Sequence, residues 1–272
     1  DSGKVFSDAE TEGIIVSTRH DSHASYVVKA MEHGKNIFVE KPLCLTKAEL
    51  EAIEEKGREL IQRKGALPII MVGYNRRFSP FIVKLNEILN KLGGKKTIIY
   101  ECNAGCIPSD HWLLSKKEGG GRLVGEACHF IDLVTYIAKA RIISHNVTFT
   151  CEKRGQTAED FIITIAFDDG SIGVIVYYSD GAKGREKERL TVNTSSSSIV
   201  INNYKSMKVY NVPNENGMWS IKQRKGQNQC ARAFVNACKG NKIDGIDTFE
   251  EMLEKQRLIL DINDDSHVDH RQ

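Results

Sequence analysis

Several features that would assign the chain to a specialised class are missing from its 272 residues. No apolar run approaches the roughly 18 residues of a membrane span, and the stretch DSGKVFSDAE has no apolar core of the kind found in signal peptides. Lysine and arginine outnumber aspartate and glutamate by only 38 to 36, so neither a basic face for nucleic acid nor a polybasic membrane anchor is expected. These absences favour small or modestly charged partners.

Cysteine is present, but in no pattern that indicates a metal or a disulfide framework. The seven cysteines form no Cys-x-x-Cys pair, and an odd, scattered set fits reduced thiols in a cytoplasm better than disulfides. No set of carboxylates and imidazoles has the spacing of zinc ligands. We therefore predict a cytoplasmic protein without a metal site.

The glycine fingerprint that opens a dinucleotide-binding Rossmann domain is missing as well. That fingerprint is a Gly-x-Gly-x-x-Gly turn after a strand, which lets a pyrophosphate approach a helix N-terminus. The stretch GGGRLVG contains Gly119 and Gly121, but Val124 stands where the third glycine would fall, and no parallel-strand pattern precedes it.

The first eighty residues do contain an alternation of short apolar strands and amphipathic helices. The segments follow one another at 14–16, 24–31, 37–39, 50–61 and 69–72. Uninterrupted apolar strands between amphipathic helices are typical of a parallel sheet that is buried on both faces.

From about residue 95 the pattern changes to longer strands joined by turns. The stretch FIITIAFDDGSIGVIVYYS predicts two strands joined at Asp169-Gly170, which is a strong hairpin signal. Helices are predicted near 126–138, 227–238 and 248–262.

The predicted fold class is therefore mixed. Residues 1–80 form the C-terminal part of a Rossmann-like α/β layer with parallel strands, and residues 81–272 form an α+β domain with a large, mainly antiparallel sheet.

Polar residues follow the second apolar strand directly. Glu40, Lys41 and Pro42 stand at its end, and ligands of open parallel sheets bind outside the carboxyl ends of the strands. These residues are therefore candidates for a site. Taken alone, a Glu-Lys-Pro triplet is more often a solvated loop.

Several motifs in register resemble the Gfo/Idh/MocA oxidoreductases, the family of glucose-fructose oxidoreductase and inositol dehydrogenase. Thr18 is followed five residues later by His23, and the stretches AMEHGKNIFVEKPLCLT, MVGYNRRFSP and GGGRLVGEACHFIDLVTYI then come in the family's order. The likeness is specific over about 10–140. It is closest to the branch in which this module forms the C-terminal half of bi-domain oxidoreductases.

This resemblance implies hydride transfer between NAD or NADP and a secondary alcohol or ketone of a sugar, cyclitol or nucleotide-sugar. It places Lys41 beside nicotinamide and substrate, ahead of a bond to proline that is often cis in the family. A partly buried lysine is a suitable donor or base at a substrate oxygen. The cofactor contacts that we predict are Thr18, Arg19, His20, His23, Glu40, Lys41, Pro42 and Asn75.

A second motif departs from the family's pattern. Many relatives carry an aspartate four residues before a histidine on a helix, whereas this chain has Gly125 four residues before His129. Glu126 lies at i, i+3 to the histidine, so it is a candidate to orient His129 or a substrate hydroxyl. We predict catalytic roles for His129 and Glu126 beside Lys41. Without the family context, a helical histidine next to Cys128 and Phe130 is more often part of the core.

Three further side chains are candidates for ligand contacts. The planar fork of Arg19 suits a phosphate or carboxylate, and a surface charge is the alternative. Arg77, which follows the third buried strand, and Trp112 are predicted substrate contacts together with His129. Trp112 is equally compatible with ordinary packing.

By the resemblance, the chain starts near the fourth strand of its sheet and lacks the contacts to the adenine half of the cofactor. An unpaired parallel edge would leave backbone donors and apolar helix faces exposed, so we expect the natural enzyme to be longer. We also expect a homo-oligomer that pairs through the large sheet. The alternative is a catalytically inactive fragment, or a sugar-binding or assembly module.

Overall fold

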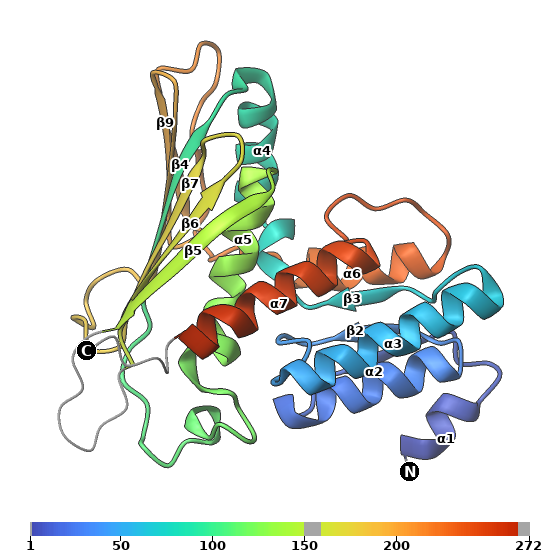
Figure 1. Cartoon of the computed structure of the whole chain (residues 1–272). Helices are drawn as coiled ribbons and strands as arrows, with labels where there is room; N and C mark the ends of the chain where they lie inside the picture. Colours follow the sequence, from blue (N-terminus) through green and yellow to red (C-terminus); the bar gives the residue numbers. More distant parts are fainter. Residues whose placement is uncertain (1, 150–158, 266–272) are drawn as a thin grey trace. The chain divides into compact units, whose positions relative to one another are not determined.

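The computed structural model describes residues 2–149 and 159–265 (Figure 1). Its contacts divide into two compact units. The first comprises the chain as far as Tyr74 together with Ser109–Cys128 and Asn228–Asp261, and the second comprises the other described residues. The units are thus not contiguous in sequence, unlike the predicted domains 1–80 and 81–272, because the chain returns twice to the first unit.

The first unit is built on a three-stranded parallel sheet in the order β1-β2-β3. Its strands are β1 (Gly13–Val16), β2 (Asn36–Val39) and β3 (Ile70–Val72). All three residues of β3 are buried, as are Ile37, Phe38 and Val39 of β2. The predicted parallel layer is confirmed, and β2 and β3 are buried as expected, whereas β1 alternates and leaves Ile15 63% exposed.

Helices cover both faces of this sheet (Figure 1). On one side lie α2 (His23–Glu32) and α3 (Lys47–Lys64), and on the other lies α6 (Gln227–Cys238). Phe234 of α6 packs against Phe38 of β2, with ring centroids 5.8 Å apart. The unit also contains the short helix α1 (Ser2–Ser7) and most of α7 (Phe249–Asp265).

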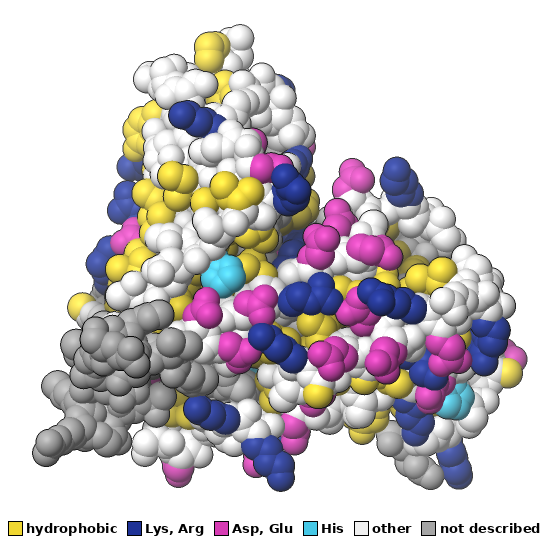
Figure 2. All heavy atoms as spheres, in the orientation of Figure 1, with side chains coloured by type: hydrophobic (Ala, Val, Ile, Leu, Met, Phe, Trp, Pro, Cys, Tyr) yellow, Lys and Arg dark blue, Asp and Glu magenta, His cyan; other side chains and the backbone are white. Residues whose placement is uncertain are grey.

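Helix α3 begins with a capping box, because Thr46 accepts from the backbone of Glu49 while the Glu49 side chain accepts from the backbone of Thr46. Phe249, at the start of α7, rests directly on Gly57 of α3. A Cβ atom at Gly57 would lie 2.2 Å from the Phe249 ring, so glycine is what lets the two helices approach. Figure 2 shows Lys and Arg interspersed with Asp and Glu over this helical surface.

The second unit contains an eight-stranded sheet in the order β11-β10-β9-β8-β4-β7-β6-β5. Only the pair β4 and β7 is parallel among these strands, so the prediction of a large, mainly antiparallel sheet is confirmed. The strands are β4 (Lys96–Asn103), β5 (Ile142–Phe149), β6 (Phe161–Phe167), β7 (Ile172–Tyr178), β8 (Glu188–Thr194), β9 (Ser197–Asn202), β10 (Ser206–Tyr210) and β11 (Met218–Trp219).

Two helices, α4 (Pro80–Leu92) and α5 (Cys128–Ala138), cover one face of the large sheet (Figure 1). Tyr100 of β4 is fully buried and stacks on Phe130 of α5, with ring centroids 4.5 Å apart. Ile162 and Ile172 belong to the opposite face, where their side chains are 45% and 48% exposed. Helix α4 has no counterpart among the predicted elements.

Within the described parts of the chain, no helix combines the length and apolarity needed to cross a membrane. The six cysteines that the structure describes are all free thiols.

Candidate active site

The residues that follow β1 and β2 are held together by a buried histidine. Lys41 and Pro42 come directly after β2 and are joined by a cis peptide bond. Nδ1 of His23 lies 2.7 Å from the carbonyl oxygen of Pro42, and Nε2 lies 3.1 Å from that of Thr18. His23 therefore connects the turn after β1 to the Lys41-Pro42 turn, which makes it a structural support of the strand ends.

The carboxyl group of Glu40 lies along the same edge of the sheet, toward the end of β3. A Cβ atom on Gly73 would be 2.9 Å from Oε2 of Glu40, so the two residues are in direct contact. Burial raises the pKa of Glu40, while the positive charge of Lys41 acts in the opposite direction. Glu40, Lys41 and Pro42 thus lie at the carboxyl edge of the parallel sheet, where the sequence places them.

The ammonium group of Lys41 donates a hydrogen bond to the backbone carbonyl of Gly125. Gly125 belongs to a π-helical turn, Leu123–Ala127, that precedes α5. Local π-helical turns are frequent at functional sites. The turn and the end of β2 therefore meet at the lysine, although 84 residues separate them in the chain.

His20 is a further titratable group at this edge and is only 6% exposed. Its Nδ1 lies 2.8 Å from the carbonyl oxygen of Gly119. Because a carbonyl only accepts, Nδ1 carries the proton and Nε2 keeps its lone pair in the neutral ring. Burial lowers the pKa of His20 to about 4, and the charge of Lys41 adds to this effect. His20 is therefore a neutral hydrogen-bond acceptor at neutral pH.

Trp112 and Arg19 lie next to His20. The Trp112 ring, in the short helical turn Trp112–Leu114, meets the His20 ring edge-on, with centroids 4.8 Å apart. The guanidinium of Arg19 lies 5.5 Å from the Trp112 ring centroid and forms an ion pair with Glu118. The structure thus brings together three predicted contacts that are separated by some 90 residues of sequence.

Glu126 has a partner within its own helical turn. Its carboxylate oxygen Oε2 lies 2.9 Å from Nη1 of Arg122, which is buried. The division between the two units falls just after Cys128, so Glu126 belongs to the first unit and His129 to the second. The predicted pairing of Glu126 with His129 stays a prediction, and the contact with Arg122 holds the carboxylate within the first unit.

In the second unit, the half-buried His129 stands in the first turn of α5. One turn further, Asp132 is 0% exposed and forms a bidentate ion pair with Arg77, which is 3% exposed. Nδ2 of Asn75 donates to the carbonyl oxygen of Lys225 at 2.8 Å. The guanidinium of Arg77 therefore fastens the turn Asn75–Phe78 to the helix that carries His129. Its predicted substrate contact stays untested.

Sequence reasoning missed the groups that hold these side chains in place, namely Gly119, Gly125, Arg122 and Asp132. One signal was available in the sequence. A lysine at a buried strand end needs a hydrogen-bond acceptor. Residue 125 is glycine where many relatives have an aspartate, and this difference pointed to the position of another acceptor.

Residues 1–64 match the family model "Oxidoreductase family, NAD-binding Rossmann fold", and residues 97–200 match the model of the GFO/IDH/MocA C-terminal domain. The parallel layer, the large second sheet and these matches place the chain in the class of Rossmann-fold oxidoreductases. Together the two models cover more than half of the chain, and it belongs to the Gfo/Idh/MocA family.

Individual relatives are distant. The scyllo-inositol 2-dehydrogenase (NAD(+)) of Bacillus subtilis is 27% identical over 206 residues, which are 72% of this chain and 57% of that protein. The myo-inositol 2-dehydrogenase of Thermotoga maritima is 25% identical over 203 residues, 68% of this chain and 58% of that protein. The chain therefore spans less than two thirds of either relative. An oxidoreductase domain protein from Kribbella flavida shares the fold, with a TM-score of 0.78, 20% identity and coverage of 98% of this chain and 81% of that one.

Proposed function

We propose that the protein is an NAD(P)-dependent dehydrogenase that acts on a secondary alcohol or ketone of a sugar, cyclitol or nucleotide-sugar. The observation that carries this proposal is the ammonium of Lys41 at the carboxyl end of β2, within an NAD-binding family. The names of the two inositol dehydrogenases to which the chain is similar support a polyol or sugar substrate.

The residues at this edge suit the nicotinamide end of a dinucleotide. The neutral His20 ring offers an acceptor at Nε2, and Lys41 and Thr18 offer donors. Thr18 already shares a hydrogen bond with Ser22, at 2.6 Å between their hydroxyl oxygens. When bound, NAD(P) supplies the hydride acceptor or donor, and the protein supplies binding, orientation and electrostatics.

Side chains of the protein would transfer the proton of the substrate hydroxyl. Gly125 is the hydrogen-bond acceptor of Lys41 among the described residues, which leaves two N–H groups of the ammonium for a substrate oxygen. Lys41 would bind that oxygen and, in the direction of ketone reduction, donate the proton that converts it to a hydroxyl. On the basis of the family motif, we propose that His129 also takes part in proton transfer. Glu126 would support it by orienting His129 or a substrate hydroxyl.

Cofactor binding provides the first test. We expect NADH or NADPH to bind the complete protein with micromolar affinity, because the strand ends offer both donors and an acceptor. The measurement is energy transfer from the tryptophans to the nicotinamide during titration. ATP, which lacks the nicotinamide, serves as the control ligand. If the complete protein binds neither NADH nor NADPH but still binds polyols, the alternative of a sugar-binding or assembly module is correct.

We further propose that copies of the chain pair through the face of the large sheet that carries Ile162 and Ile172. These exposed side chains are accompanied by the half-buried Ile99, Val174 and Val176. Apolar side chains of this kind on one sheet face favour a self-complementary interface.

We also propose that the protein is located in the cytoplasm, because its described cysteines are free thiols. Cell fractionation would test this proposal.

The pairing proposal predicts that Ile162→Lys combined with Ile172→Lys produces monomers, because charges on such a face must be desolvated on association. Light scattering coupled to size-exclusion chromatography measures the mass. Val83→Lys, at an exposed site of α4, is the matched control and should leave the mass unchanged. A double variant that keeps the wild-type mass would count against this interface.

A further inference from the structure

The acceptor of the Lys41 ammonium is a backbone carbonyl, and it belongs to the residue at which the chain departs from the family motif. Gly125 stands four residues before His129 and has no side chain to offer. Its carbonyl lies in the π-helical turn Leu123–Ala127 and receives the hydrogen bond from Lys41. A neutral backbone group therefore binds the ammonium at this point.

The turn can reach this position only with glycine at residue 125. A Cβ atom there would lie 2.6 Å from Cδ1 of Leu113, 2.8 Å from the carbonyl oxygen of Gly119 and 3.3 Å from Cε1 of His20. The first two distances are shorter than non-bonded contacts of a Cβ atom with carbon or oxygen tolerate, so atoms would have to shift. A larger residue would push the turn away from the loop formed by residues 113–119, and the carbonyl would move with it.

The obstructing carbonyl is itself part of the site. The oxygen of Gly119 accepts from Nδ1 of His20 at 2.8 Å, so the loop is fastened to the strand end on which His20 lies. Contacts in space therefore connect the His20 ring to the Gly119 carbonyl and this carbonyl to the Gly125 backbone. The carbonyl of Gly125 in turn accepts the hydrogen bond from Lys41. A displacement of Gly125 would therefore change the position of the carbonyl that binds the Lys41 ammonium.

We propose that Gly125 is a positioning residue for Lys41. Its carbonyl fixes the direction of the ammonium, and its missing side chain lets the π-helical turn approach the strand end closely enough to do so. This inference rests on the proposed function only for its effect on turnover. The hydrogen bond and the packing exist whether or not the protein is a dehydrogenase.

Gly125→Ala in the complete protein tests the proposal. We expect kcat to fall by about 10²-fold, with a much smaller change in KM, because a displacement of the order of 1 Å at a catalytic group has an effect of this size. Acylation of Lys41, followed by peptide mass spectrometry, should become several-fold faster relative to the exposed Lys208. A folded Gly125→Ala protein with unchanged Lys41 acylation would overturn the proposal.

Two comparisons separate positioning from general damage. Gly184→Ala is the matched control, since a Cβ atom there meets nothing within 4 Å, and both readouts should stay at wild-type values. Adding Leu113→Ala to Gly125→Ala removes the 2.6 Å contact between the new Cβ atom and Cδ1 of Leu113. The double variant should regain part of the activity, and its Lys41 should be acylated more slowly than in Gly125→Ala. Failure of this rescue, with both variants folded, would also speak against positioning.

A measurement on the unmodified protein keeps the proposal testable if Gly125→Ala does not fold. The nuclear magnetic resonance coupling across the hydrogen bond, from the Nζ nitrogen of Lys41 to the carbonyl carbon of Gly125, should be observable. Its absence while other lysine ammonium signals are visible would overturn the proposal. A wild-type protein that shows the coupling but oxidises no polyol would instead overturn the proposed function alone.

Discussion

Lys41→Met is expected to lower the turnover of the complete protein by about 10²-fold or more. The substitution removes the ammonium at the carboxyl end of β2 but keeps an aliphatic stem of similar length, so the turn that His23 holds should remain intact. The measurement is the steady-state rate of NAD(P) reduction with a panel of polyols and sugars. His129→Ala should cause a loss of similar size.

A matched lysine in the same unit provides the control. Lys47 begins α3 and forms an ion pair with Asp261 in which both side chains are about half exposed. Lys47→Met should therefore leave turnover unchanged, because an exposed pair contributes little. If Lys41→Met retains a near-normal rate, Lys41 has no part in the chemistry, and the observation that carries the proposed function is lost.

Local signals account for most of what the sequence predicts correctly. The parallel strands follow from three apolar runs between amphipathic helices, and the hairpin between β6 and β7 follows from Asp169-Gly170. Capping boxes at Thr46 and Thr248 have an equally local signal, a threonine followed three residues later by a glutamate. Each of these signals acts within a few residues, so one sequence suffices to detect it.

The rest of the site depends on groups that are distant in sequence. Arg77 and Asp132 are 55 residues apart, and no periodicity links a guanidinium after one strand to a carboxylate in a later helix. The acceptor of Lys41 is a carbonyl, which every residue possesses, so its identity follows from packing at Gly125 and not from residue type. The fold class and the lysine could be predicted, whereas the groups that hold the lysine could not.

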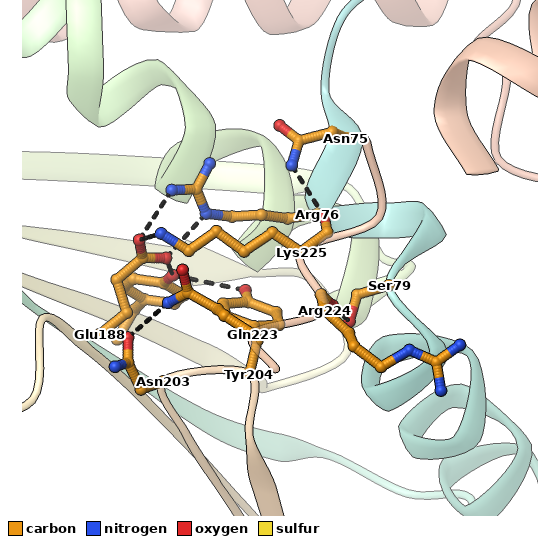
Figure 3. Close-up of polar contacts among 10 residues, drawn as sticks. Asn75, Arg76, Ser79, Glu188, Asn203, Tyr204, Gln223, Arg224 and Lys225 are labelled. Carbon is orange, nitrogen blue, oxygen red and sulfur yellow. Dashed lines mark hydrogen bonds and ion pairs between the residues drawn. The ribbon is translucent and has the colours of Figure 1, made fainter. Parts of the chain in front are cut away.

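Glu188 is a buried carboxylate of the second unit with several hydrogen-bond donors around it (Figure 3). Its side chain is 1% exposed and accepts from Nε of Arg76 at 2.8 Å, from Nη2 of Arg76 at 2.9 Å and from Nζ of Lys225 at 2.6 Å. The hydroxyl of Tyr100 also donates to it. Glu188 therefore joins the large sheet to the turn that follows β3 and to the segment that leads into α6.

That segment is fastened at neighbouring positions too. Backbone carbonyls of Arg224 and Lys225 accept from Ser79 and Asn75, and the backbone N–H of Arg224 donates to the carbonyl of Tyr204 (Figure 3). Loss of the charge at Glu188 would leave two cations facing a neutral group inside this arrangement. Breaking one partner of a buried charge network is strongly destabilising for this reason.

Glu188→Gln is expected to lower the free energy of unfolding by about 3–5 kcal/mol near neutral pH. The change preserves the size of the side chain, so the loss reports the uncompensated charges of Arg76 and Lys225. Urea unfolding followed by circular dichroism gives the value. Asp168→Asn is the control, because its partner Arg141 is largely exposed and such a pair contributes only about 0–1 kcal/mol.

The same variant should alter the dependence of stability on pH. Burial alone would raise the pKa of Glu188, but the charge of Arg76, its hydrogen bonds and the ammonium of Lys225 outweigh burial and lower the pKa to about 2. A carboxylate whose pKa is depressed in the folded state stabilises above its unfolded value of about 4.3, and this stability is lost as the pH falls toward the folded value. The difference between wild type and Glu188→Gln should therefore be constant above about pH 5 and shrink between about pH 4.3 and pH 2. A difference that stays the same at low pH would mean that the charge of Glu188 is not what holds the segment to the sheet.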